Sequence, residues 1–164
     1  MKRYCFAAGL ALAALTVLGL TGPTGAGEDV PFRGRLEGDV VISPVPGGPP
    51  TLVDVQVTAT GNGTYLGKFS LSIPHRVDRS TTPPSAAGHY LFTAANGDTL
   101  SATFTGQAMP PPAPGVLSIV ETATITGGTG RFAGATGSFV SERLFNTING
   151  TTTGSYSGTI SYGP

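Results

Sequence analysis

The stretch Thr124–Phe139, "TITGGTGRFAGATGSF", links two strand-like runs through a cluster of glycines. Gly, Thr and Ala make up most of it, so it offers little material for a core. Glycine adopts positive φ in a tight turn without a Cβ clash, and a glycine inside a strand lets the sheet bend. We therefore predict that "GGTG", residues 127–130, is a tight hairpin turn in a strongly coiled sheet.

Similar runs fill the rest of the chain after the first 26 residues. Each run alternates apolar and polar residues or is rich in β-branched residues, and none shows a helical period. Turn-forming residues separate them. The eight predicted strands are 31–42, 51–60, 64–73, 89–95, 99–107, 116–125, 131–144 and 152–162.

The connectors between these runs are alternately long and short. The long ones are "SPVPGGPP", "PHRVDRSTTPPSAAG", "AMPPPAPG" and "FNTINGT", and the short ones are "GNG", "ANG" and "GGTG". In an up-and-down meander, successive connections lie at opposite ends, so all long connectors would share one end. A sheet with one apolar face must close or pack on a second sheet, and closure removes exposed edges. We predict an all-β, eight-stranded antiparallel up-and-down barrel, with a two-sheet sandwich as the alternative.

The apolar pattern also predicts two registers, since a slip of one residue moves every side chain to the other face. Both "GNG" and "ANG" fit three-residue loops better than two-residue loops. The predicted pairs are Val57 with Gly67, Val55 with Phe69 and Val53 with Leu71 in the first hairpin, and Phe92 with Leu100 and Tyr90 with Ala102 in the second.

The N-terminal segment has the pattern of a cleaved secretory signal peptide. Lys2 and Arg3 precede an uncharged apolar run, Cys5–Leu20, and small residues follow it up to Ala26. The run is shorter than the roughly 20 residues that span a bilayer. We predict a signal peptide over residues 1–26, a single barrel domain over 27–164, and a secreted or periplasmic protein. An uncleaved membrane anchor is the alternative.

Composition excludes several classes of function. No cysteine remains after residue 26, so neither disulfides nor thiolate chemistry is expected. Nine acidic and seven basic residues follow Ala26, giving a mature net charge near −2. No basic face points to nucleic acid, and no polybasic run points to a membrane surface after signal cleavage. No motif calls for a cofactor, and the sequence carries no catalytic signature.

"GGTGRFAGATGSF" resembles the glycine-rich hairpin of the barrel shared by allene oxide cyclases and dirigent proteins. "YLGKFS" (65–70) and "FTAANGDTLSATFTG" (92–106) are similar to further pieces of bacterial secreted members of unassigned function. The resemblance implies an eight-stranded antiparallel barrel, often trimeric, with a cavity open at one end. In the plant members that cavity handles an unsaturated fatty-acid epoxide or phenoxy radicals. The cavity residues of those enzymes do not map onto this chain.

Glu121 is the most unusual residue of the predicted strands. It shares strand parity with Ile119 and Ala123, so we predict that it points into the barrel. A carboxyl group there could transfer a proton or orient a polar ligand. It could equally be neutralised by an Arg or Tyr of another strand, or turned outward by a bulge. A two-residue turn across "GGTG" would bring Phe132 and Val140 to its face, and a three-residue turn would bring Phe139.

The longest connector gathers the remaining candidate side chains. Loops on a rigid scaffold often bind ligands, and barrel mouths often host small molecules. Two histidines with one aspartate on a proline-rich loop are weak evidence for a metal, and we predict none. The candidate ligand-binding residues are Glu121, His75, Arg76, Asp78, Arg79 and His89.

Three functions fit these observations. The favoured one is a secreted barrel of unassigned activity that binds a small apolar ligand at the long-connector end. The second is an isomerase or cyclase of the allene oxide cyclase kind, which would need a polar cluster at the cavity floor. The third is an extracellular structural or interaction module, for which the polar Thr-rich outer face is a poor apolar interface. A homo-oligomer, a trimer by the resemblance, is a further expectation.

Overall fold

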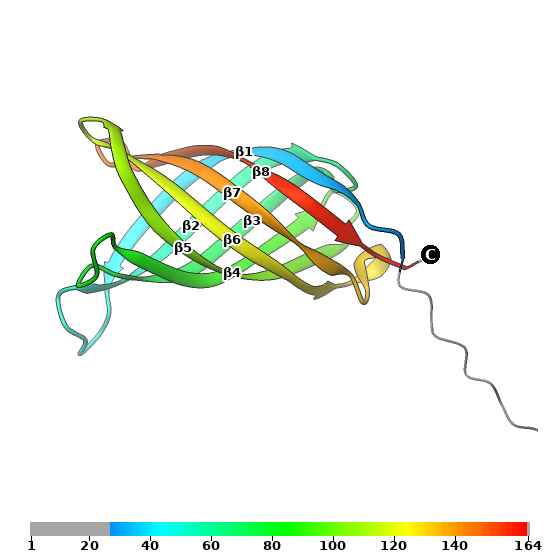
Figure 1. Cartoon of the computed structure of the whole chain (residues 1–164), viewed down its shortest axis with the longest axis horizontal. Helices are drawn as coiled ribbons and strands as arrows, with labels where there is room; N and C mark the ends of the chain where they lie inside the picture. The colour runs from blue at the N-terminus through cyan, green and yellow to red at the C-terminus, as the bar shows by residue number, and fades with distance from the viewer. Residues whose placement is uncertain (1–26, 164) are drawn as a thin grey trace, which may run out of the picture.

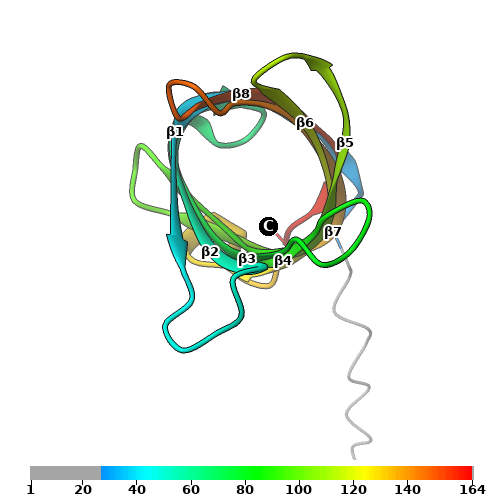
Figure 2. The same ribbon diagram turned by 90° about the vertical axis from the view of Figure 1, so that its left-hand side faces the viewer.

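The computed structural model describes residues 27–163, which form one closed antiparallel barrel of eight strands. Each strand pairs with its neighbours in the chain, and β1 pairs with β8 to close the ring (Figures 1 and 2). The predicted fold class is confirmed. The predicted signal peptide lies outside the described residues. The strands are β1 (Val30–Pro44), β2 (Leu52–Gly63), β3 (Gly67–Asp78), β4 (Ser85–Ala94), β5 (Thr99–Ala113), β6 (Val116–Gly128), β7 (Thr136–Asn146) and β8 (Thr151–Ser161).

The connections divide between the two ends of the barrel as predicted. Those after β1, β3, β5 and β7 lie at one end, which we call the mouth end, on the left of Figure 1. Those after β2, β4 and β6 lie at the other, which we call the turn end and which also holds the C-terminus. The proline-rich connector after β5 is mostly strand, because β5 runs on to Ala113 and turns at residues 114–115. No helix in residues 27–163 is long and apolar enough to span a membrane.

The register predicted for the first hairpin is wrong. β2 continues through "GNG" to Gly63, and the chain turns at residues 64–66 before β3 begins, so Val57 lies opposite Ile73 rather than Gly67. The turn uses positive φ at Tyr65 (61°) and Gly67 (63°). The shift is an even number of residues, so the predicted inward face is unchanged. The register predicted for the "ANG" hairpin is confirmed, with Phe92 opposite Leu100 and Tyr90 opposite Ala102.

The "GGTG" segment is not a tight turn, contrary to the prediction. The chain between β6 and β7 forms a short 3-10 helix, η1 (Gly130–Phe132), which buries Phe132 completely. The register then places Ala123 opposite Phe139, with Phe139 inside and Val140 outside. Phe139 is the residue that the three-residue turn would have brought to the inner face, although the connection itself is longer than three residues.

Aromatic side chains fill the turn end of the barrel. Rings of five inward-facing residues have centroids 4.8–6.2 Å apart, mostly edge to face, a geometry that adds to the gain from burial. The interior is therefore solid at this end, and any internal space must lie toward the mouth. These residues are Phe32, Phe69, Phe92, Phe139 and Tyr156.

Candidate functional site in the mouth of the barrel

A cavity of about 740 Å³ occupies the mouth end of the barrel. Valines from β2, with Leu117 and Ile119 of β6 and Phe145 of β7, form most of its wall. Prolines from the β3–β4 connection and from β5 line its entrance. The polar side chains that contribute to the lining are His75, Arg79, Thr82, Gln107, Glu121 and Arg143.

Glu121 points into the barrel, as predicted, and is fully buried. Its carboxylate accepts a hydrogen bond from Arg143 Nη2 to Oε1 at 2.5 Å and another from Arg143 Nε to Oε2 at 3.0 Å. The Tyr90 hydroxyl also donates to Oε2. Both partners come from other strands, β7 and β4, as the parity argument requires. A bidentate pair of this kind is among the stronger polar contacts in proteins.

Glycines on neighbouring strands make room for this cluster. A Cβ at Gly106 would lie 2.6 Å from Glu121 Cγ, and one at Gly154 would lie 2.7 Å from Arg143 Cγ. In the register, Gly106 lies opposite Glu121, and Gly154 lies opposite Arg143. Each long polar side chain thus lies over a glycine, which has no side chain. The space left by the two glycines lets an ion pair fit inside an eight-stranded barrel.

The electrostatics keep Arg143 charged and the Tyr90 hydroxyl protonated. Burial by itself would lower the pKa of Arg143, but the Glu121 carboxylate outweighs it, so the pKa lies above its usual value. Burial, reinforced by the same carboxylate, raises the pKa of Tyr90. The Tyr90 hydroxyl therefore stays protonated and remains a donor at neutral pH. Each oxygen of Glu121 already has a donor, so within this structure the carboxylate is held in place and neutralised.

His75 lies near the cluster and is partly buried in the lining of the cavity. Its ring packs edge-on against Phe104, with centroids 5.6 Å apart, and its Nδ1 lies 3.0 Å from the carbonyl oxygen of Ile73. A Cβ at Gly88 would lie 2.3 Å from His75 Cβ, so this inward side chain also lies opposite a glycine. Burial lowers the pKa of His75, against the opposing effects of the Ile73 carbonyl and the Glu121 carboxylate. The imidazole is therefore neutral at pH 7.

The structure separates the six predicted site residues. His75, Arg79 and Glu121 line the mouth cavity. Arg76 and Asp78 instead line a hollow on the outer wall, where Arg76 Nε pairs with Asp54 Oδ1 at 2.9 Å. His89 is exposed on the outer face of β4, because its parity is opposite to that of the buried Tyr90. No cluster of three or more His, Cys, Asp or Glu that could hold a metal occurs among residues 27–163.

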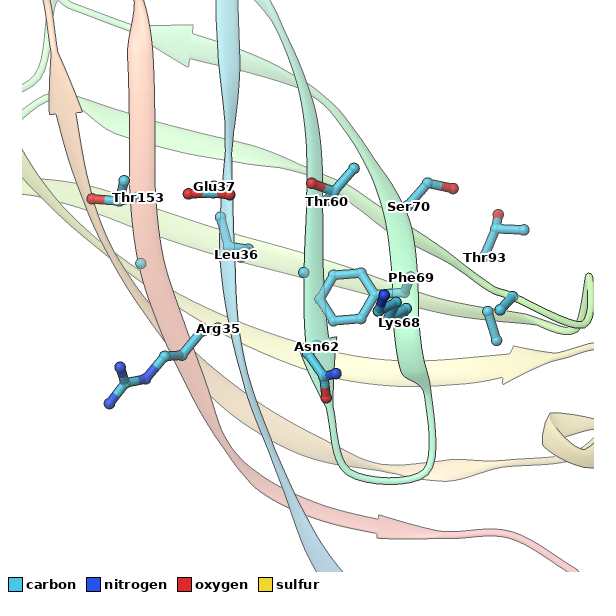
Figure 3. A pocket seen from close by; sticks show the side chains of 14 residues that line it. Arg35, Leu36, Glu37, Thr60, Asn62, Lys68, Phe69, Ser70, Thr93 and Thr153 are labelled. Carbon is cyan, nitrogen blue, oxygen red and sulfur yellow. The ribbon is translucent and has the colours of Figure 1, made fainter.

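A further hollow, of about 780 Å³, lies on the outer wall across β8, β1, β2, β3 and β4 (Figure 3). Outward-facing polar and charged side chains such as Arg35, Glu37 and Lys68 surround it. It is an open groove rather than an enclosed space, and its volume therefore includes solvent. The mouth cavity, which inward-facing apolar side chains enclose, is the better candidate for a ligand.

Sequence reasoning did not identify Arg143 or Tyr90 as members of the site. A signal for Arg143 was available: it has the parity of Phe139 and Phe145, so it is a charged residue on an apolar face, like Glu121. Combining the two required the register between β6 and β7, which the unexpected 3-10 helix had obscured. Tyr90 looks like an ordinary core aromatic, and only its hydroxyl contact to Glu121 distinguishes it.

Comparison with known proteins supports the architecture. No family model matches the sequence, and no curated protein matches it. Solved structures of similar fold include two dirigent proteins. The pterocarpan synthase dirigent protein GePTS1 is 15% identical with a TM-score of 0.55, over 94% of this chain and 100% of that one. The pterocarpan synthase dirigent protein PsPTS1 is 12% identical with a TM-score of 0.57, over 85% of this chain and 99% of that one. The chain thus shares its fold, a closed eight-stranded antiparallel β-barrel, with these two dirigent proteins.

Proposed function

We propose that the protein is a secreted binding barrel that takes up a small, mainly apolar molecule through its mouth end. The observation that carries this proposal is the apolar cavity of about 740 Å³ inside the mouth end. Small-molecule sites typically occupy about 300–1,000 Å³, with apolar walls and a few polar groups. The mouth cavity has that size and that composition.

The design of the entrance supports the same function. Proline has a fixed φ, so Pro83, Pro84, Pro110 and Pro111 form an apolar entrance with little freedom to lose on binding. In a preorganised site, less of the binding free energy is spent on ordering the protein when the ligand binds. At the other end, the aromatic core and Phe132 fill the interior, so a ligand would enter and leave by the mouth.

Binding of the neutral dye N-phenyl-1-naphthylamine tests this function. We expect saturable fluorescence enhancement with one site per chain. Ile119→Trp, which places an indole in the cavity, should abolish it. Val140→Trp is the matched control, because Val140 is 41% exposed on the outer wall, and it should bind as the unmodified protein does. Equal binding by both variants would refute the proposal.

Secretion is part of the proposal and rests on the charge and apolar pattern of residues 1–26. When the full chain is expressed in a bacterial host, the exported protein should have the mass of a chain that begins at Gly27. Recovery of the full-length chain in the membrane fraction would favour the uncleaved anchor instead.

A second candidate, an isomerase or cyclase, is favoured by one observation. The Tyr90–Glu121–Arg143 cluster adjoins the inner end of an apolar cavity, where water is scarce and fixed charges act strongly on a reacting group. Cyclisation of an unsaturated fatty-acid epoxide in the presence of the protein would test it. We expect an excess of one product enantiomer that Glu121→Gln removes. A racemic product with the unmodified protein would exclude this candidate for that substrate.

A further inference from the structure

His75 has a hydrogen-bonding arrangement that constrains what the cavity can hold. Its Nδ1 lies 3.0 Å from the carbonyl oxygen of Ile73. A carbonyl oxygen only accepts hydrogen bonds, so Nδ1 carries the ring proton. A neutral imidazole has one N–H, and Nε2 is therefore a bare acceptor.

That acceptor has no partner in the protein. Among residues 27–163, no side chain or backbone group donates to His75 Nε2. The buried side-chain polar atoms without a partner in this part of the chain are Ser141 Oγ and the Tyr156 hydroxyl. Nε2 is not one of them, because His75 is only partly buried and lines the open cavity.

The neighbouring polar groups of the cluster bond to one another rather than to Nε2. Side chains of Glu121 and Arg143 are each only 1% exposed and are bound to one another. Tyr90 donates its only hydroxyl proton to Glu121. The groups directly against His75 are apolar, with Val55 opposite it on β2 and Phe104 against its ring. The other polar side chains of the lining are Arg79, Thr82 and Gln107. A ligand that reaches His75 thus meets an unsatisfied acceptor beside apolar neighbours.

We propose that His75 is a specificity-determining residue, and that its Nε2 selects apolar ligands that carry a hydroxyl or another single hydrogen-bond donor near their inner end. This inference rests on the proposed binding function. A ligand without a donor would displace water from Nε2 without replacing its hydrogen bond, and so would bind more weakly by about the contribution of that bond.

Two isomeric probes isolate the effect of a hydrogen-bond donor on the ligand. 1-Decanol has a hydroxyl group, whereas 1-methoxynonane has the same atoms and an ether oxygen that cannot donate. Both are titrated as competitors of N-phenyl-1-naphthylamine on the full barrel. We expect the alcohol to compete roughly three- to tenfold more strongly than the ether, the effect of one hydrogen bond.

Two variants assign that preference to His75. His75→Phe keeps an aromatic ring of similar size against Phe104 but removes the acceptor, and it should bind both probes with equal affinity. His75→Gln places an amide oxygen near the former Nε2 and should restore part of the preference. His75→Phe is uninformative only if it binds neither probe, and His75→Gln then serves as the test. If His75→Gln still prefers the alcohol to the ether, the inference is supported. If it binds them equally, the inference is overturned.

The outcomes distinguish this inference from the function on which it rests. Equal binding of both probes to the unmodified protein, or a preference that persists in His75→Phe, overturns the role of His75 and leaves the binding function intact. If neither probe displaces the dye, and the dye itself does not bind, the binding function fails and this inference fails with it.

Discussion

At the scale of single residues, two buried tyrosines differ in what their hydroxyl groups contact. The Tyr90 hydroxyl donates to the buried Glu121 carboxylate. The Tyr156 hydroxyl is buried without a partner among the described residues and occupies space beside Gly34 and Gly63, which have no side chains. Burial raises the pKa of both groups, so both stay protonated.

The same substitution at these two positions should therefore have opposite effects. Tyr90→Phe should lower the free energy of unfolding by about 1.5–3 kcal/mol, the range for a hydrogen bond to a charged group. Tyr156→Phe removes an unsatisfied hydroxyl and should leave stability unchanged or raise it. Urea denaturation measures both. A comparable loss in the two variants would contradict the assigned contacts.

The stability of the barrel should also depend on keeping both partners of the buried Glu121–Arg143 ion pair. Arg143→Met leaves the buried Glu121 carboxyl without its partner, which should cost about 3–5 kcal/mol in unfolding free energy. Glu121→Gln combined with Arg143→Met should recover part of that loss. Asp54→Asn breaks the exposed pair with Arg76 on the outer wall and serves as control, because exposed pairs contribute far less. A double variant no better than the single one would argue against coupling.

The lowered pKa of His75 should make the free energy of unfolding depend on pH in a specific way. Because its pKa is lower in the folded protein than in the unfolded chain, the unfolded state binds the proton more readily as the pH falls below about 6.5. Stability contributed by the neutral ring is thus present above that pH and is lost on acidification. The charged groups that act on it from other strands are Glu121 and Arg143.

These groups remain in His75→Phe, so the difference between the two proteins reports on His75. We expect the unmodified protein to lose more unfolding free energy than the variant between pH 7.5 and pH 5, measured by urea denaturation. Parallel losses would show that another group is responsible.

At the scale of elements, sequence pattern predicted faces well and turns poorly. Alternation placed Val57, Ile73 and Glu121 on the inner face, because parity depends only on the strand period. The turn of the first hairpin was misplaced because "GNG" is a common turn signal, whereas the chain turns at Tyr65, a bulky residue that rarely takes positive φ. Buried Leu66 anchors that turn, and such an anchor depends on tertiary packing that the local sequence does not reveal.

Gly67 offers a test of the corrected turn. Its φ is +63°, and a Cβ there would meet nothing within 4 Å, so substitution changes only the backbone energy. Gly67→Ala should lower the unfolding free energy by about 1–2 kcal/mol, and Gly67→Asn should lower it less, because Asn tolerates the left-handed region. Thermal denaturation compares them. Unchanged stability in Gly67→Ala would place the turn elsewhere.

At the scale of the whole molecule, the alternation of long and short connectors was sufficient to predict the barrel and its mouth. The connector pattern could not show how deep the mouth cavity is. Its depth depends on where, along the barrel interior, the aromatic side chains end and the smaller valine side chains begin. The connector pattern also gave no measure of the polar floor, since Glu121, Arg143 and His75 come from three strands. The glycines opposite them are visible in the sequence, but their pairing is known only once the registers are.

We expect the ligand to enter the mouth cavity rather than to bind at the outer wall or the turn end. Amide NMR shifts of the assigned barrel during titration with 1-decanol distinguish these places. Saturable shifts are expected around Val55, His75 and Ile119, with none at Phe32 in the aromatic core. Shifts confined to the outer groove around Arg35 and Lys68, or to the turn end around Phe132, would contradict this expectation.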